Sequence, residues 1–142
     1  MRVRRLLVAG LACATTSLTL VTGSAQAKTP KPKLYDLYFC VTYEAPPGAG
    51  GFCGSETVQV FPKSKTALLN GELPGAFSTH KVGGTKYTDF HFPLGPDVPE
   101  GFEYNDGVKD STGYSSQASP GAWSFTFEGS VEAEGTWWMV KV

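Results

Sequence analysis

The chain has 142 residues, of which 18% are charged and 13% aromatic, and its formal net charge is −1. All of its arginines lie within the first five residues, so every later basic residue is a lysine. A domain without arginine is poorly equipped to recognise phosphates or base edges, which excludes nucleic acid as a partner.

The first 27 residues have the features of a secretory signal peptide. Three arginines precede a mostly apolar run, Leu6 to Val21, and Ala25-Gln26-Ala27 is a typical cleavage signal. One alternative is a membrane anchor, but the apolar run is short and is interrupted by Thr and Ser. Another alternative is a lipid anchor at Cys13. We expect a secreted protein, processed after Ala27, with no stable membrane insertion after processing.

The chain from Lys28 to Val142 is long enough for one domain with its own core. It carries nine lysines and 13 acidic residues, a formal charge of −4. Its first six residues, 28–33, form a Pro/Lys tail that favours an extended, flexible conformation. We therefore predict a single β-domain over residues 34–142.

Two cysteines remain after processing, Cys40 and Cys53, and an even count in an exported chain predicts one disulfide. The alternative is a free reactive thiol. Apolar and polar residues alternate over 34–43 and 52–61, on either side of a Pro/Gly-rich loop. If Cys40 opposes Cys53, Tyr35 opposes Val58 and the apolar faces of both strands coincide. This agreement predicts a disulfide-bridged antiparallel hairpin.

Two further hairpins are predicted in the middle of the chain. Asn70-Gly71 favours a tight turn between short strands, although a single helical turn is the alternative. Gly83-Gly84 lies between strands at 76–82 and 85–92. The stretch 93–112 is rich in proline, glycine and acids and is predicted to be a long loop. The stretch 112–121 is a Ser/Gly-rich connection that leaves room for a short edge strand at Tyr114.

The final twenty residues, WSFTFEGSVEAEGTWWMVKV, alternate with period two, which is typical of strands with one buried face. A two-residue turn at Glu134-Gly135 would place Trp138 inside, opposite Val131, and Trp137 outside. A three-residue loop would instead put Trp137 and Met139 inside. With turns throughout and no helical period, we predict an all-β fold, a small antiparallel β-sandwich or barrel with one disulfide.

One group of residues suggests chemistry. In the Gly83-Gly84 hairpin, Ser78, His80, Tyr87, Asp89 and His91 share one face. His80, Asp89 and His91 are candidate ligands for a metal, and with Ser78 they suggest a hydrolase. However, the two histidines are two residue pairs apart, too far to bind one ion easily. A solvated sheet face is the favoured interpretation, and no cofactor is expected.

Five acids, Asp97, Glu100, Glu103, Asp106 and Asp110, could gather a calcium ion. Their spacing lacks the pattern of an EF-hand loop, and a solvated acidic loop is favoured.

The chain carries 18 aromatic residues, all after position 27. Trp137 and Tyr38 are predicted to lie outside the main core. They either pack a second sheet or form exposed platforms for a ligand. We expect a secreted, non-enzymatic binding module whose partner is a carbohydrate, a cell-envelope polymer or a protein. The alternatives are a protease inhibitor, with loop 44–52 or 93–110 as the bait, and the small hydrolase or metalloenzyme described above.

Overall fold

The computed structural model of the chain describes residues 30–44 and 51–142. The predicted signal peptide, Cys13, the first two residues of the tail and most of the 44–52 loop lie outside these residues. The described chain is built from antiparallel strands without helices, which confirms the all-β prediction. The strands are β1 (Lys33–Glu44), β2 (Cys53–Phe61), β3 (Thr66–Leu69), β4 (Leu73–Val82), β5 (Thr85–Gly95), β6 (Val98–Lys109), β7 (Gly113–Ser115), β8 (Trp123–Phe127) and β9 (Ser130–Lys141).

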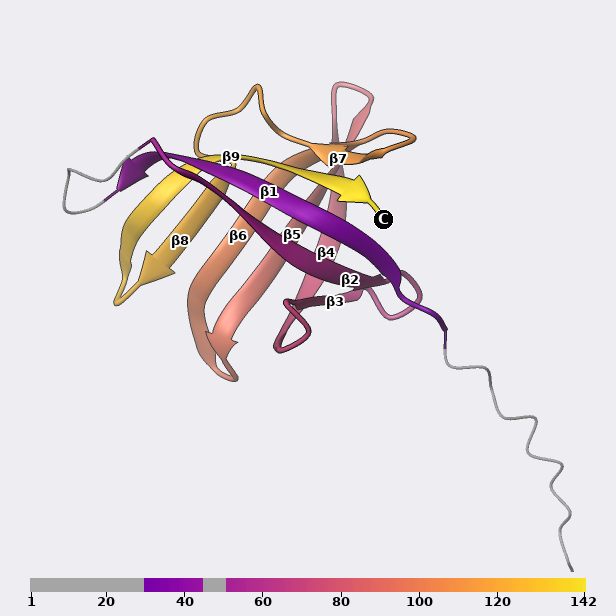
Figure 1. Cartoon of the computed structure of the whole chain (residues 1–142), viewed down its shortest axis with the longest axis horizontal. Coiled ribbons are helices and arrows are strands. Elements are labelled where there is room, and N and C mark those ends of the chain that lie inside the picture. Colours follow the sequence, from indigo (N-terminus) through magenta and orange to yellow (C-terminus); the bar gives the residue numbers. More distant parts are fainter. Residues whose placement is uncertain (1–29, 45–50) are drawn as a thin grey trace, which may run out of the picture.

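The strands close into a barrel (Figure 1). Strands β1 to β6 pair in chain order, and β9 pairs with β1 to complete the wall. Strands β7 and β8 both lie between β6 and β9. β8 pairs with 102–104 of β6, whereas β7 pairs with Val108 and Lys109 at its other end. The two short strands therefore share one position, and nine strands make an eight-stranded barrel.

The barrel interior is filled by apolar side chains, many of them aromatic. At its centre Trp137 meets Phe90 and Tyr104 edge to face, with ring centroids 6.0 and 5.7 Å apart. The Trp137 indole N–H donates a hydrogen bond of 2.8 Å to the backbone carbonyl of Asn105. Edge-to-face packing is a favoured arrangement of aromatic rings, and it lets large side chains fill a small barrel. The remaining core includes Tyr35, Leu37, Val41, Val58, Val60, Ala67, Leu69, Phe92, Tyr114, Ala122, Trp123 and Met139.

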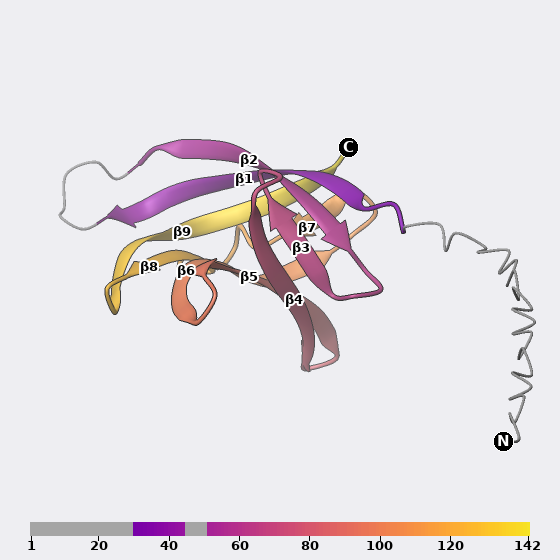
Figure 2. The same cartoon turned by 90° about the horizontal axis from the view of Figure 1, so that it is seen from below.

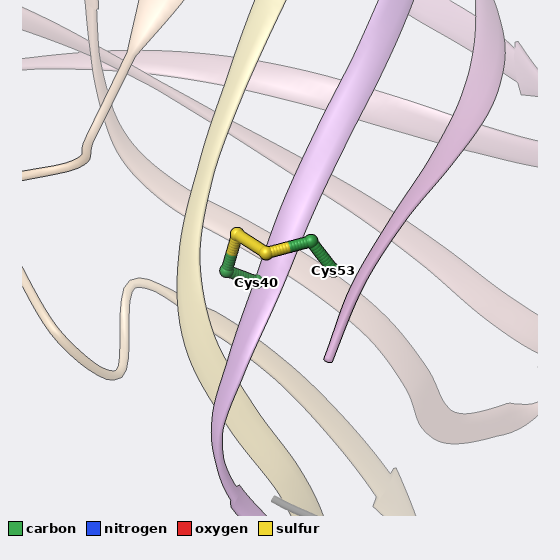
Figure 3. Close-up of a disulfide and its surroundings, with 2 residues drawn as sticks. All are labelled: Cys40 and Cys53. Carbon is green, nitrogen blue, oxygen red and sulfur yellow. A yellow bond between two sulfur atoms is a disulfide. The ribbon is translucent and has the colours of Figure 1, made fainter. Parts of the chain in front are cut away.

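The predicted disulfide is confirmed. Cys40 and Cys53 are cross-strand partners in β1 and β2, and their sulfur atoms are 2.06 Å apart (Figure 3). Tyr35 opposes Val58, as the alternation predicted, and both point into the core. The bridge lies on the outer side of the wall because Cys40 alternates with Phe39 and Val41, which pack in the core. A disulfide of this kind suits an oxidising compartment.

Both central hairpins are confirmed. Asn70 and Gly71 have φ angles of 51° and 72°, the two positive values that a tight hairpin turn requires. Gly83 and Gly84 have positive φ values as well, and His80 opposes Tyr87 across the β4–β5 hairpin as predicted.

The predicted long loop at 93–112 is wrong, because most of this stretch forms strand β6. A turn at Pro96-Asp97 joins β5 to β6, and Asp97 has a φ of 64°. Tyr104 and Gly107 both face the interior although they are three residues apart. A bulge between them, where the pairing with β5 shifts register, makes this spacing possible. Such a bulge hides the period-two pattern that identifies a strand.

The predicted turn at Glu134-Gly135 is also wrong. The turn between β8 and β9 is formed by Glu128 and Gly129, both with positive φ. A bulge follows, since Phe125 pairs with Ala133 while Thr126 pairs with Val131. As a result Trp137 and Met139 face the core, and Trp138 faces outward. This is the orientation expected for a three-residue loop, but a bulge produces it instead.

Candidate functional site

The fold sorts the charges of the chain toward the two ends of the barrel. In an antiparallel meander, alternate turns lie at the same end. The lysines precede or begin β1, follow β2, border the β4–β5 turn, or end β6 and β9. The turns at the other end carry acids instead, namely Glu72, Asp97 and Glu128. The described lysines are Lys31, Lys33, Lys63, Lys65, Lys81, Lys86, Lys109 and Lys141.

A cleft of about 710 Å³ opens at this lysine-rich end. Its base is aromatic and includes Tyr35, Phe77 and Tyr114, with the two tyrosine rings 5.6 Å apart. Four lysines from different strands and turns surround it, and Asp110 is the one acid in its lining. Volumes of this order are typical of small-molecule sites in proteins. The surrounding lysines are Lys33, Lys65, Lys86 and Lys109.

Asp110 does not neutralise these lysines through direct pairing. The hydroxyl of Thr112 and the backbone N–H groups of Gly113 and Thr112 donate hydrogen bonds to one oxygen of its carboxylate. These bonds, with the Thr112 hydroxyl first, lower the pKa of Asp110. The carboxylate therefore serves mainly to hold the β6–β7 turn, a common role for aspartate.

The tyrosines of the cleft are neutral hydrogen-bonding groups. Burial, reinforced by the neighbouring Tyr35, raises the pKa of Tyr114 to about 12. The ammonium of Lys109 lies 5.8 Å from the centre of the Tyr114 ring, within the range of a cation–π contact. This contact places one positive charge directly beside the aromatic base.

A second group of functional side chains lies on the outer wall of β4, β5 and β6. Nδ1 of His80 is 2.7 Å from Oδ2 of Asp89, and Nε2 of His80 is 3.6 Å from Oδ1 of Asp106. The other oxygen of Asp89 accepts a hydrogen bond of 2.8 Å from the Asp106 backbone N–H. The Tyr87 ring stacks on the imidazole at 5.4 Å. The two carboxylates therefore approach opposite nitrogens of one ring.

This arrangement only partly matches the predicted group of His80, Asp89 and His91. His80 and Asp89 do come together, but Nδ1 of His91 lies 3.5 Å from Glu103 instead. Asp106 takes the place expected for His91. Ser78 opposes Asp89 in the backbone register, so it shares the hairpin face as predicted.

The five candidate calcium ligands do not form a group of their own. Asp97 lies in the turn before β6 and Asp110 follows the last residue of that strand, at the opposite end of the barrel. Within the described chain, the group of three or more suitable side chains with converging ligand atoms is His80, Asp89 and Asp106.

The predicted ligand-binding aromatics fall in different places. Trp137 is fully buried, so it presents no ring to the outer surface. Tyr38 is only partly buried on the outer wall, where it stacks on Trp138 with ring centroids 5.4 Å apart. The register predicted for β9 was wrong by one residue, so the inward and outward positions predicted for Trp138 and Trp137 are reversed. A cleft of about 320 Å³ adjoins Tyr38, lined by polar residues such as Asp36 and Asn70.

Sequence reasoning missed the lysine-rich cleft. The signal was the position of the lysines beside alternate turns of the predicted hairpins, which share an end in any antiparallel meander. Asp106 had no such signal, because a strand at 98–109 was not predicted and its partner residues were therefore unknown.

In the described residues, helices that could span a membrane are absent. Comparisons of the chain with protein-family models, curated proteins and solved structures found no match.

Proposed function

We propose that this chain is a small secreted binding protein whose lysine-rich cleft holds an anionic ligand with an apolar part. The observation that supports this is the combination of four lysines and an aromatic base in one cleft of about 710 Å³. Secretion is supported by the predicted signal peptide and by the disulfide, which suits an oxidising compartment.

Charge selects the class of ligand. The cleft lining contains four ammonium groups and one carboxylate, that of Asp110, which is already hydrogen-bonded within its own turn. A cleft lined by one sign of charge concentrates field lines and attracts the opposite charge. The turns at the other end carry Glu72, Asp97 and Glu128, so an anion is attracted to the lysine-rich end and repelled from the other. The ligand therefore carries a carboxylate, sulfate or phosphate group.

The aromatic base selects for the remainder of the ligand. Tyr35, Phe77 and Tyr114 offer ring surface next to the lysines, with phenol groups that remain protonated at neutral pH. Lysines are mobile point charges and impose little shape on an anion. Selectivity then depends on how the apolar part of the ligand fits the rings. A hydrophilic inorganic anion alone would leave the aromatic base without contacts.

Binding, rather than catalysis, suits this lining. The cleft offers ammonium groups, phenols and threonine hydroxyls, which orient and hold a ligand. An adjoining depression of about 100 Å³ adds Lys141, so a second anionic group on the same ligand would find a partner.

Two fluorescent probes of nearly the same shape test the proposal. Anilinonaphthalene sulfonate carries a negative group, and N-phenylnaphthylamine is its neutral counterpart. The wild-type protein should bind the sulfonate at least tenfold more tightly, since one charge-assisted hydrogen bond is worth about 1.5–3 kcal/mol. Added salt should narrow the difference because exposed charges are screened.

A matched pair of variants locates the site. Lys65→Gln, Lys86→Gln and Lys109→Gln together remove three lysines of the cleft, whereas Lys63→Gln with Lys81→Gln removes lysines at the same end that do not line it. The triple variant should lose most of its affinity for the sulfonate. The double variant should change that affinity by less than about threefold, because lysines outside the cleft act on the sulfonate only through long-range electrostatics. Equal binding of both probes, or equal losses in both variants, would contradict the proposal.

A further inference from the structure

We infer that His80 and Asp106 form a binding site for a divalent transition-metal ion, oriented by Asp89. The site lies on the outer face of β4, β5 and β6, whose alternate residues Thr79, Lys86 and Thr88 line the lysine-rich cleft, and it does not depend on the function proposed above. Strands β4 and β5 form a hairpin that projects from the barrel (Figure 2). His80 pairs with Tyr87 across this hairpin, and its side chain is exposed.

The spacing of the ligand atoms fits one ion. Nε2 of His80 and Oδ1 of Asp106 are 3.6 Å apart. Two atoms that each lie about 2.0–2.1 Å from a zinc ion, at a tetrahedral or slightly wider angle, are separated by about 3.4–3.6 Å. An ion between them needs little rearrangement of either side chain, and water completes its coordination.

Asp89 prepares the imidazole for this role. Its Oδ2 lies 2.7 Å from Nδ1, within hydrogen-bond distance, so this carboxylate favours the tautomer with the proton on Nδ1. The lone pair is then on Nε2, the nitrogen that faces Asp106. A carboxylate on the far side of a histidine ligand is the usual way in which proteins fix its tautomer and orientation.

Two more contacts hold the group in place. Tyr87 stacks on the His80 ring, at 5.4 Å and an interplanar angle of 22°. The Asp106 backbone donates a hydrogen bond to Asp89, which ties both carboxylates together. Asp106 itself has a φ of 59° in the bulge of β6, a conformation that non-glycine residues seldom adopt. The bulge turns its side chain toward His80, as bulges often do at functional positions.

The ligand types decide the class of ion. Imidazole nitrogen favours zinc, copper, nickel and cobalt, whereas calcium and magnesium prefer sites made of oxygen. A neighbouring cleft of about 430 Å³, lined by Tyr87, Asp106 and Gln117 among others, leaves the ion open to solvent or to a small ligand. With two protein ligands, the site is expected to bind its ion reversibly.

Titration calorimetry with zinc chloride, on protein without a histidine tag and freed of metal by a chelator, tests the site. One equivalent of zinc should bind, and millimolar calcium should not displace it. His80→Gln and Asp106→Asn should each weaken binding at least tenfold. Asparagine also tolerates positive φ, so the second variant keeps the bulge. Asp89→Asn should weaken binding about tenfold, as expected for an orienting group.

The second histidine provides the matched control. His91 also faces a carboxylate, Glu103, at 3.5 Å, but it lacks a second one. His91→Gln should leave zinc affinity unchanged. In the copper-loaded protein, electron paramagnetic resonance should show coupling to one imidazole nitrogen, retained in Asp89→Asn and lost in His80→Gln. Absence of zinc binding at millimolar concentration, an equal loss in His91→Gln, or unchanged affinity in Asp106→Asn or Asp89→Asn would overturn the inference.

Discussion

Replacement of Trp137 by alanine should destabilise the barrel severely. The side chain is fully buried between Phe90 and Tyr104, and its indole N–H bonds to the Asn105 carbonyl. Loss of a buried tryptophan costs about 3–5 kcal/mol. The Asn105 carbonyl, left without its hydrogen-bond donor, adds about 1 kcal/mol to this loss. The expected loss is about 4–6 kcal/mol, comparable with the whole stability of many small domains.

The adjacent Trp138 provides the comparison. It is only partly buried on the outer wall, where its ring stacks on that of Tyr38. A stacked aromatic pair of this kind contributes about 0.5–1.5 kcal/mol beyond its buried area. Trp138→Ala should therefore lower the free energy of unfolding by about 1–2 kcal/mol.

Urea unfolding followed by far-ultraviolet circular dichroism measures both losses without relying on tryptophan fluorescence. If Trp137→Ala does not fold, Trp137→Phe keeps a ring in the core and removes only part of the packing and the bond to Asn105, for an expected loss of about 1–3 kcal/mol. A loss of more than about 3 kcal/mol in Trp138→Ala, larger than any loss expected for Trp137→Phe, would refute the reasoning. It would mean that Trp138 faces the core, as a turn at Glu134-Gly135 requires.

Two more predictions concern the disulfide and the buried tyrosines. Cys40→Ser with Cys53→Ser should lower the free energy of unfolding by about 2–4 kcal/mol, because the bridge closes a loop of about 15 residues. If the chain is exported as proposed, mass spectrometry of the mature protein should find both thiols oxidised and Lys28 at the N-terminus, and two free thiols would disprove the bond. Burial raises the pKa of Tyr114 to about 12, so its contribution to stability is complete below pH 10 and is lost as pH rises through 12. Urea midpoints measured from pH 9 to 12 should fall less steeply in Tyr114→Phe than in the wild type, and identical slopes would show that this phenol does not contribute.

The local pattern of the sequence determined the hairpins with short, well-marked turns. Asn70-Gly71 and Gly83-Gly84 are residues that adopt positive φ readily, and the flanking strands alternate cleanly. The β1–β2 pairing was equally accessible, since the two cysteines and the apolar faces demand the same register. In each case the deciding interactions lie within about twenty residues of one another, so the sequence alone was enough.

The two bulges could not be predicted in this way. An extra residue in β6 between Tyr104 and Gly107, and another in β9 near Val131, each shift the alternation by one position. Phe127 and Val131 extend the apolar pattern at the tip of the last hairpin, yet both are exposed there. The pairing of β9 with β1 holds the register in which Trp137 enters the core. Since these two strands lie about one hundred residues apart in sequence, the local pattern could not predict that register.

The candidate sites depend even more on tertiary structure. Asp106 reaches His80 only because β6 lies beside β5 with a bulge at that point. The lysines are scattered along the sequence and separated by neutral and acidic stretches. The sequence determined that each lies near a strand end, but the antiparallel barrel determined that these ends meet, because every second turn of a closed meander lies at the same end.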